Sequence, residues 1–162
     1  MTIQEFRNYM ASGKTIEGGS DVHMMFHRLS QEALRITAEI NGKYHTPEEL
    51  HKLLEQLWGR EVPKSVGLFP PFHTDCGKNT VVGERVFINM GRKFQDQGGI
   101  TIDEGALIGR NVVLATLNHL LDPERRTVYL CCYKRLFYAG SKLLPARYDC
   151  RHVQGLHQLR KV

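Results

Sequence analysis

The sequence predicts a mainly β protein, in which a short triangular parallel β-solenoid follows an N-terminal α-helical cap and precedes an irregular C-terminal tail. Three observations predict it. Helical spacing of apolar residues fills the first part of the chain, a six-residue repeat fills the middle, and neither period continues into the basic end. We place the boundaries at 1–62, 63–126 and 127–162. At 162 residues the chain is long enough to bury a core of its own.

Two amphipathic helices are expected in residues 1–62. The first begins at the capping residue Ser20 and stops near Asn41-Gly42. Its apolar positions recur about every 3.6 residues, at Val22, Met25, Phe26, Leu29, Ala33, Ile36 and Ile40. The second begins with the capping box at 46–49, where Pro47 takes the first helical position, and it ends at Gly59. This part shows no catalytic constellation, so we interpret its histidines, methionines and tryptophan as core and surface residues.

A six-residue period organises residues 63–126. Its leading apolar positions lie six apart except for a step of eight across Gly98-Gly99, and they are Cys76, Val82, Ile88, Phe94, Ile102, Ile108 and Leu114. The fifth position of most hexads is small or β-branched, whereas Arg92 departs from this rule. In a triangular solenoid each hexad makes one short strand and a turn, and three hexads make a coil of 18 residues. A β-meander with chance spacing is the alternative, which seven phased positions disfavour.

The stretch from Pro70 to Pro123 also carries recognisable motifs. They are Pro70-Pro71-Phe72, Asp75-Cys76-Gly77-Lys78-Asn79, Phe87-Ile88-Asn89, Ile100-Thr101-Ile102-Asp103, Leu107-Ile108-Gly109-Arg110-Asn111-Val112 and Asn118-His119. Together they resemble the hexapeptide-repeat sugar O-acetyltransferases, the maltose and galactoside acetyltransferase group. The resemblance covers about residues 1–126. It implies a left-handed parallel β-helix, acetyl-CoA as the donor, a sugar hydroxyl as the acceptor, and a homotrimer with active sites between subunits.

The same resemblance implies roles for five residues. In the family, a histidine at the position of His119 is the general base that takes the proton of the attacking sugar hydroxyl. Asp75, Asn89 and Asp96 match positions that line the acceptor pocket, and Phe87 falls where an aromatic ring packs beside the sugar. The alternative is structural: Asp and Asn favour turns for backbone reasons, and a single histidine beside a loop is often a surface residue. No residue is assigned to coenzyme A.

The pattern breaks at Thr127. Residues 127–162 carry seven Lys or Arg and one acidic residue, and the family's later Trp-Ile-Gly and Pro-Gly-Val-Thr-Ile-Gly hexads do not follow. This change suggests truncation or a frameshift after about residue 126, because 145–152 can be encoded so that reading one base later gives Gln-Pro-Gly-Met-Thr-Val-Gly. The alternative function is therefore a catalytically inactive remnant or interaction protein that lacks the coenzyme A groove. A further alternative is a tail that caps the solenoid.

Other classes of protein are disfavoured. No Cys/His spacing suits zinc, and the solenoid carries His73 and His119, whereas the γ-type carbonic anhydrases of similar fold use three histidines, so no metal is expected. No nucleic-acid-binding motif accompanies the basic tail, and no apolar run approaches the ~20 residues of a membrane helix. No nucleic acid or membrane partner is expected. The N-terminus lacks the pattern of a signal peptide, so we expect a cytoplasmic protein.

Overall fold

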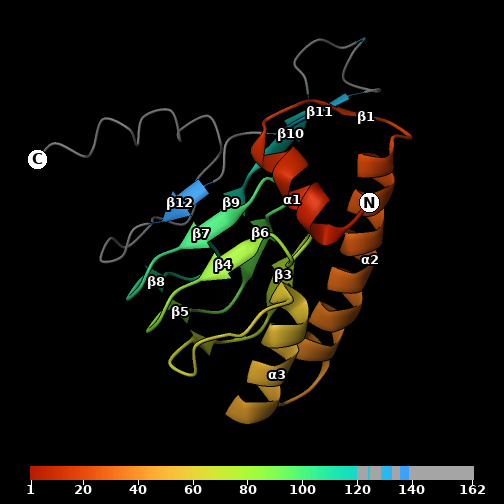
Figure 1. Ribbon diagram of the computed structural model, residues 1–162. Coiled ribbons are helices and arrows are strands. Elements are labelled where there is room, and N and C mark those ends of the chain that lie inside the picture. Colours follow the sequence, from red (N-terminus) through yellow and green to blue (C-terminus); the bar gives the residue numbers. More distant parts are fainter. Residues whose placement is uncertain (120–123, 125–128, 133–135, 139–162) are drawn as a thin grey trace, which may run out of the picture.

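The computed structural model describes residues 1–119, 124, 129–132 and 136–138. In this part the helices α1 (Ile3–Ala11), α2 (Asp21–Gly42) and α3 (Pro47–Trp58) precede the solenoid, with the short strand β1 (Ile16–Glu17) between α1 and α2 (Figure 1). The two helices expected from the sequence are confirmed as α2 and α3. None of the helices in the described part is long and apolar enough to cross a membrane.

Side-chain caps explain where these helices begin. The side chain of Ser20 accepts a hydrogen bond from the His23 amide at the start of α2, and Thr46 forms a complete capping box with Glu49 at the start of α3. Helix α1 was not expected, although Thr2 and Glu5 form the same capping box there. A helix this short is stable because it buries Phe6 and Met10 in a hydrophobic cluster with residues of α2 and β1.

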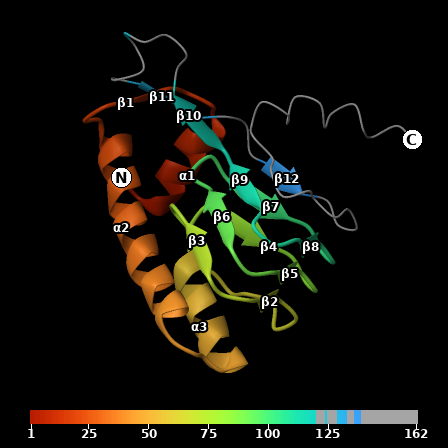
Figure 2. The same cartoon turned by 180° about the vertical axis from the view of Figure 1, so that it is seen from behind.

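The next strands form stacked coils. They are β2 (Gly67–Leu68), β3 (Phe72–Thr74), β4 (Thr80–Val82), β5 (Phe87–Ile88), β6 (Arg92–Gln95), β7 (Ile100–Ile102), β8 (Leu107–Ile108) and β9 (Val113–Ala115). All the pairs among them are parallel, in the sheets β2-β5-β8, β3-β6-β9 and β4-β7. Figure 2 shows β3, β6 and β9 side by side on one face. The expected parallel β architecture behind an N-terminal helical part is therefore confirmed.

The coil length differs from the expectation of 18 residues. Each strand residue pairs with one 20 positions later, as in Ile88 with Ile108 and Val82 with Ile102. The step of eight residues seen at Phe94 to Ile102 also occurs one coil earlier, because Thr74 is the residue that pairs with Phe94. Thr74, not Cys76, therefore occupies the leading position of that hexad. The two extra residues of each long step widen the turn that follows the sheet β3-β6-β9. This turn comprises residues 75–79 in one coil and 96–99 in the next, and we call it the wide corner.

Two hydrophobic cores hold the helices and the solenoid together. The larger core lies inside the coils, where the buried side chains of Ile88 and Ile108 stack, and Trp58 of α3 belongs to the same cluster. The smaller core joins α1, α2 and β1 to the wide corner. Its buried members are Phe6, Met10, Ile16, Val22, Met25, Leu29, Cys76 and Leu117. The N-terminal helices therefore cover the corner from which the chain leaves the solenoid.

The last described strands differ from the irregular tail that was expected. Strand β10 (Leu117–His119) pairs antiparallel with β11 (Tyr129–Cys132), which pairs antiparallel with β1. Strand β12 (Leu136–Tyr138) pairs parallel with β7 and extends its sheet. A strand can pair with an open sheet edge through its backbone alone, without a repeating pattern of side chains. The sequence of these strands therefore shows no hydrophobic period that would have predicted them. The segment 145–152, on which the frameshift hypothesis depends, lies outside the described residues.

Candidate functional site

The wide corner brings together two of the five residues singled out by the sequence, Asp75 and Asp96, and the strand that carries a third, His119, begins just beyond it. The Asp75 amide donates to Phe94 O at 2.9 Å, and the Thr116 amide donates to Gln95 O at 2.9 Å. Asp75, Asp96 and Thr116 therefore lie at the same corner of successive coils, and β10 carries His119 directly onward from it. Figure 2 shows β10 continuing from this end of β9 toward β11 and β1.

Asp96 is fully buried at this corner. Its Oδ1 accepts hydrogen bonds from Thr74 Oγ1 at 2.7 Å and from the Cys76 amide at 2.9 Å, and its Oδ2 accepts from Thr80 Oγ1 at 2.7 Å. Burial raises the pKa of Asp96 above its ordinary value, while these hydrogen bonds act in the opposite direction. The carboxylate therefore fixes both ends of the loop 75–79, one coil away, and is not open to solvent.

Asp75 is the exposed carboxyl of the same corner, and Gln97 lies behind it. The Gln97 side chain hydrogen-bonds the Asp75 carboxyl, and its backbone oxygen accepts from Asn79 Nδ2 at 2.6 Å. Burial raises the pKa of Asp75, and the hydrogen bond from Gln97 partly offsets this. Gln97 is itself buried, and its Oε1 has no hydrogen-bond partner among the described residues. Sequence reasoning missed Gln97; the only signal was its place in the eight-residue step beside Asp96.

His119 stands at the end of β10 with an exposed side chain. Two residues earlier, Leu117 is buried in the smaller core and anchors the strand. The His119 backbone pairs with Leu130 of β11, and its amide donates to Asn118 Oδ1 at 2.8 Å. The imidazole is therefore carried on a fixed strand and faces solvent, as a group that exchanges a proton with a substrate requires.

Phe87 and Asn89 lie at a different corner, where β5 ends. The Phe69 amide donates to Ile88 O at 2.9 Å, and the Asn89 amide donates to Ile108 O at 3.1 Å. This corner precedes the sheet β3-β6-β9, whereas Asp75 and His119 follow it. A strand of four residues such as β6 spans about 13 Å. Within one chain the structure thus separates Phe87 and Asn89 from His119 by the width of a solenoid face.

Metal and thiol chemistry find no support at the corner. The described residues contain no group of three or more His, Cys, Asp or Glu side chains placed to hold a metal ion. Cys76 is buried, and burial, together with the nearby Asp96, raises the pKa of its thiol. A thiol that stays protonated is a poor nucleophile. Among the described residues, Asp75 at the corner and His119 at the end of β10 are exposed titratable groups.

Comparisons with known proteins agree with this architecture, although no family model matches the chain. Nodulation protein L of Rhizobium meliloti (strain 1021) is 35% identical over 79 residues, which are 49% of this chain and 43% of that protein. A hexapeptide-repeat acetyltransferase from Vibrio cholerae is 30% identical with a TM-score of 0.67, covering 80% of this chain and 69% of that one. A structure of the Vibrio cholerae acetyltransferase complexed with acetyl coenzyme A is 28% identical, with a TM-score of 0.61.

The fold and these similarities define a parallel β-solenoid protein of the acyltransferase class. The chain belongs to the hexapeptide-repeat acetyltransferases, as the resemblance of its motifs implied. A maltose O-acetyltransferase from Clostridium difficile 630 shares the fold at 24% identity and a TM-score of 0.69, covering 78% of this chain and 66% of that one. The chain spans less than half the length of the nodulation protein that it matches.

Proposed function

We propose that the protein is an acetyl-CoA-dependent O-acetyltransferase that acetylates a sugar hydroxyl, with His119 as the general base. The observation that carries the proposal is the exposed imidazole on the fixed strand β10, in a chain that belongs to an acetyltransferase family. The structure solved with acetyl coenzyme A for the Vibrio cholerae relative supports this molecule as the donor. No metal is required, because the imidazole itself removes the proton.

The reaction follows from the chemistry of a neutral imidazole with a pKa of about 6.5. His119 accepts the proton of the acceptor hydroxyl as that oxygen attacks the carbonyl carbon of the thioester. The tetrahedral intermediate then collapses, the carbon–sulfur bond breaks, and the imidazolium returns the proton to the departing thiolate of coenzyme A. The acetyl ester and the free thiol are the products, and His119 is neutral again. A positioned base of this kind contributes about 10²–10⁴-fold to the rate.

Asp75 is the corner residue that we propose to accept a hydrogen bond from the acceptor sugar. Its carboxyl is exposed at the corner from which the chain continues to β10, and Gln97 lies next to it. Asp96 contributes indirectly, because both of its oxygens are used within the protein to fix the loop 75–79. Orientation of a hydroxyl near the base accounts for much of the rate of such a reaction.

The separation of Phe87 and Asn89 from His119 favours a site shared between copies. We propose a homotrimer of left-handed β-helices in which Phe87 and Asn89 of one subunit face His119 of the next. Such an arrangement would bring the two corners together without crossing a solenoid face. A cytoplasmic location, where acetyl-CoA is available, suits this function. The residues that hold coenzyme A are not assigned, because the longer relatives extend beyond the matched part of the chain.

Release of thiol from acetyl-CoA tests the proposal directly. We expect release by the purified chain that depends on an added sugar, and a loss of about 10²–10⁴-fold in His119→Ala. His27→Ala, which removes a histidine of α2, is the matched control and should retain full activity. Sugar-dependent release that survives in His119→Ala would contradict the role of His119. Folded protein without any release would instead favour the inactive remnant or interaction protein.

A further inference from the structure

The corner that carries Asn89 presents hydrogen-bond donors and positive charge. The Asn89 side-chain Oδ1 accepts from the Met90 amide at 2.9 Å, so its Nδ2 is the part of this side chain that is left to donate to a ligand. The Asn89 amide donates to Ile108 O at 3.1 Å, and the Asn111 amide donates to Met90 O at 3.2 Å. Arg110 therefore lies at the same corner in the adjacent coil, and its side chain is exposed.

A second guanidinium lies beneath this corner. Arg92 is fully buried and donates to the carbonyl oxygens of Met90 and Ile108, and Ile108 O also accepts from the Asn89 amide. Burial lowers the pKa of Arg92 to about 10, and the charge of Arg110 adds to this effect because the two guanidiniums lie near each other. Both arginines remain charged at pH 7, so two positive charges meet next to Asn89.

No carboxylate in the described part of the chain balances these charges. Neither Arg92 nor Arg110 forms an ion pair there, and Arg92 Nε has no hydrogen-bond partner among the same residues. Arg92 also occupies the fifth position of its hexad, where Val86 and Val112 are the equivalent residues. A buried charge without a partner is costly, and departures of this kind from a local rule are typical of functional sites. The unbalanced positive charge therefore favours an anionic ligand.

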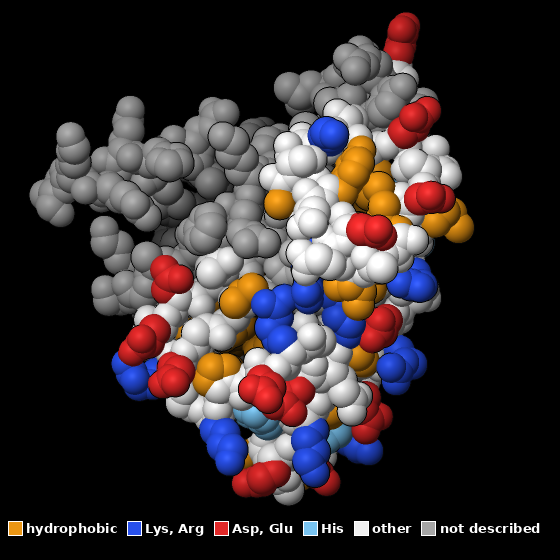
Figure 3. All heavy atoms as spheres, in the orientation of Figure 1, with side chains coloured by type: hydrophobic (Ala, Val, Ile, Leu, Met, Phe, Trp, Pro, Cys, Tyr) orange, Lys and Arg blue, Asp and Glu red, His pale blue; other side chains and the backbone are white. Residues whose placement is uncertain are grey.

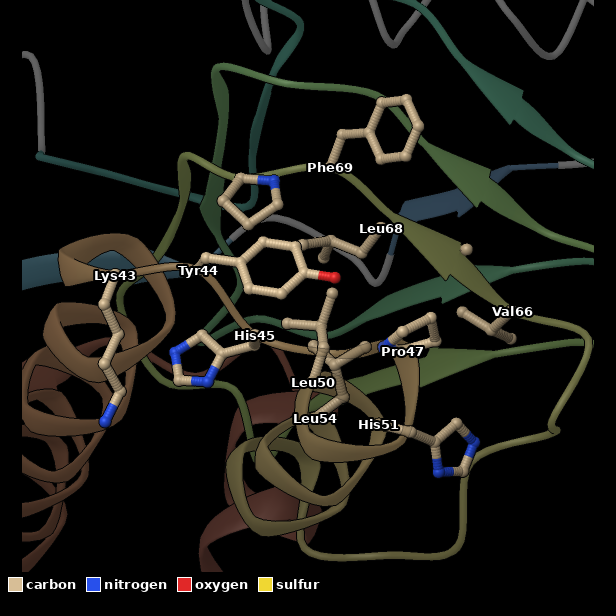
Figure 4. A pocket seen from close by; sticks show the side chains of 12 residues that line it. Lys43, Tyr44, His45, Pro47, Leu50, His51, Leu54, Val66, Leu68 and Phe69 are labelled. Atoms are coloured by element: carbon tan, nitrogen blue, oxygen red, sulfur yellow. The ribbon is translucent and has the colours of Figure 1, made fainter.

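The other side of Asn89 lacks this charge. The Phe69 amide donates to Ile88 O at 2.9 Å, so Phe69 lies beside Asn89 in the first coil. Figure 4 shows Phe69 at a cleft of about 520 Å³ that is lined mainly by apolar side chains, among them Leu50 and Leu54 of α3. An anionic group held near Asn89 is therefore accommodated on the arginine side of the corner.

We propose that this corner binds an acidic sugar, whose carboxylate or phosphate is held by the Arg110 guanidinium and the Asn89 side-chain amide. The inference rests on the proposed function, because it takes Asn89 as part of the acceptor site. A guanidinium matches the geometry of carboxylate and phosphate oxygens. Arg92 does not touch the anion, but its buried charge is screened less than an exposed one and adds to the positive potential at the corner. The enzyme thereby selects acidic sugars over neutral ones.

Matched acidic and neutral sugars test this site by equilibrium binding without acetyl-CoA. The probes are methyl β-D-glucopyranosiduronic acid with methyl β-D-glucopyranoside, glucose 6-phosphate with glucose, and the corresponding galactose compounds. For at least one pair we expect the acidic member to bind about tenfold more tightly, and this preference should decline as the salt concentration rises. Inorganic phosphate alone should bind more weakly than the sugar phosphate, because it lacks the sugar's contacts.

Three variants locate the anion. Arg110→Gln should reduce the preference to about threefold or less, since it removes the direct contact. Arg92→Met should reduce the preference by about threefold. This variant also relieves a buried charge, so weaker binding is not a consequence of unfolding. Arg85→Gln is the matched control: it removes an exposed arginine of another corner, which pairs with Glu104, and should change the preference by less than about twofold.

Binding and transfer separate the two proposals. Equal binding within every pair, a preference that survives in Arg110→Gln, or binding of inorganic phosphate as tight as that of the sugar phosphate would overturn the site even if acetyl transfer occurs. An unchanged preference in Arg92→Met would overturn the part assigned to Arg92. A preference that Arg110→Gln removes and Arg85→Gln keeps supports the site even if no sugar is acetylated, in which case the transferase function fails alone. If both hold, the ratio of kcat/KM values for the acidic and neutral sugars should fall in Arg110→Gln by the same factor as the binding ratio.

Discussion

Asp96 and Thr80 are joined by a hydrogen bond of 2.7 Å between Asp96 Oδ2 and Thr80 Oγ1, which crosses from one coil to the next. Asp96 Oδ1 also accepts hydrogen bonds from Thr74 Oγ1 and from the Cys76 amide. One buried carboxylate therefore holds the two coils together at the wide corner. The corner has two more residues than a hexad requires, and its backbone therefore departs from the regular strand ladder. The carboxylate supplies acceptors that the ladder does not.

Replacement of Asp96 should show how much these three hydrogen bonds contribute to the free energy of unfolding. We expect Asp96→Ala to lower the free energy of unfolding by about 2–4 kcal/mol, because buried donors of Thr74, Thr80 and Cys76 lose their acceptor. Asp96→Asn keeps one carbonyl oxygen and should lose less. Urea denaturation of the three proteins measures the difference. Equal stability of wild type and Asp96→Ala would show that the hydroxyls find other acceptors.

Burial also gives this residue a defined pH dependence. Because burial raises the folded-state pKa of Asp96 above the ordinary 3.8, the folded state binds the proton more tightly than the unfolded state. Stability from this group therefore falls as pH rises from about 3.8 through the folded-state pKa. The stability of wild type relative to Asp96→Asn should decline over that interval. A difference that is independent of pH would contradict the raised pKa.

Arg92 is a buried cation whose replacement should stabilise the protein. Its guanidinium donates to the carbonyl oxygens of Met90 and Ile108, and its Nε has no partner among the described residues. Burial, with a smaller effect of Arg110, lowers the pKa of Arg92 to about 10. We expect Arg92→Met, which is similar in volume, to raise the free energy of unfolding by about 1–3 kcal/mol at pH 7. Equal or lower stability of the variant would indicate that the two hydrogen bonds outweigh the desolvation.

The gain from Arg92→Met should depend on pH in a predictable direction. The unfolded chain keeps the ordinary, higher pKa of arginine, so above about pH 10 the unfolded state binds more protons than the folded state. The cost of the buried charge is therefore complete below about pH 10 and declines above it. Paired denaturation curves at pH 8 and at the highest pH that both proteins tolerate should show the two stabilities converging. Divergence with rising pH would contradict the assignment.

Lys78 and Glu32 form an ion pair with 2.9 Å between Lys78 Nζ and Glu32 Oε1. We expect the two residues to contribute unequally to the free energy of unfolding. Lys78 is buried, and its Nζ also donates to Gln56 O at 2.5 Å and to Leu57 O at 3.2 Å at the end of α3. Arg7 and Arg60 both donate to Lys78 O. Figure 3 shows a group of basic side chains in the middle of the face that it displays. Lys78 thus joins α2, α3 and the wide corner.

We expect Lys78→Met to lower the free energy of unfolding by about 2–3 kcal/mol, because the last carbonyls of α3 lose their donor. Glu32→Gln should cost less than about 1 kcal/mol, since Glu32 is 40% exposed and Lys78 keeps its helix carbonyls. Urea denaturation of both variants, with Lys43→Met of the exposed pair with Glu39 as control, measures the contrast. A larger effect for Glu32→Gln than for Lys78→Met would contradict this division.

The sequence predicted those elements whose signals are local. Helices α2 and α3 carry their own caps, at Ser20 and Thr46, and the leading aliphatic residues Ile88 and Ile108 mark the coils. The coil length was wrong because hydrophobicity favoured Cys76 over Thr74 as a leading position. Only the pairing of Thr74 with Phe94 in the next coil reveals the longer step.

In the candidate site, too, the relationships that could not be predicted are those between residues far apart in the sequence. The exposure of His119 agrees with its implied role, but the burial of Asp96 and the position of Gln97 behind Asp75 depend on neighbours about 20 residues away. The distance between the corners of Asn89 and His119 likewise depends on how the coils stack. No motif in the sequence encodes these relationships.

Removal of residues 127–162 tests whether the last strands stabilise the solenoid. Strand β12 covers the edge of β7, and β11 is the central strand that links β10 to β1. A chain ending at 126 exposes both edges, so we expect its Tm to fall by about 5–10 °C and its tendency to associate to rise. A chain ending at 138 keeps both strands and is the matched comparison.

Amide hydrogen exchange identifies which contacts cause the change. In the chain ending at 126, exchange should accelerate at residues 117–119, which lose β11, and less strongly within 100–102, which lose β12 but keep β4. Residues 87–88 of β5 keep both neighbours and should stay protected. The chain ending at 138 should protect all three segments. An unchanged Tm, with unchanged exchange at residues 117–119, would mean that the solenoid and β10 are stable without β11 and β12, and that the buried Leu117 is enough to hold His119 in place.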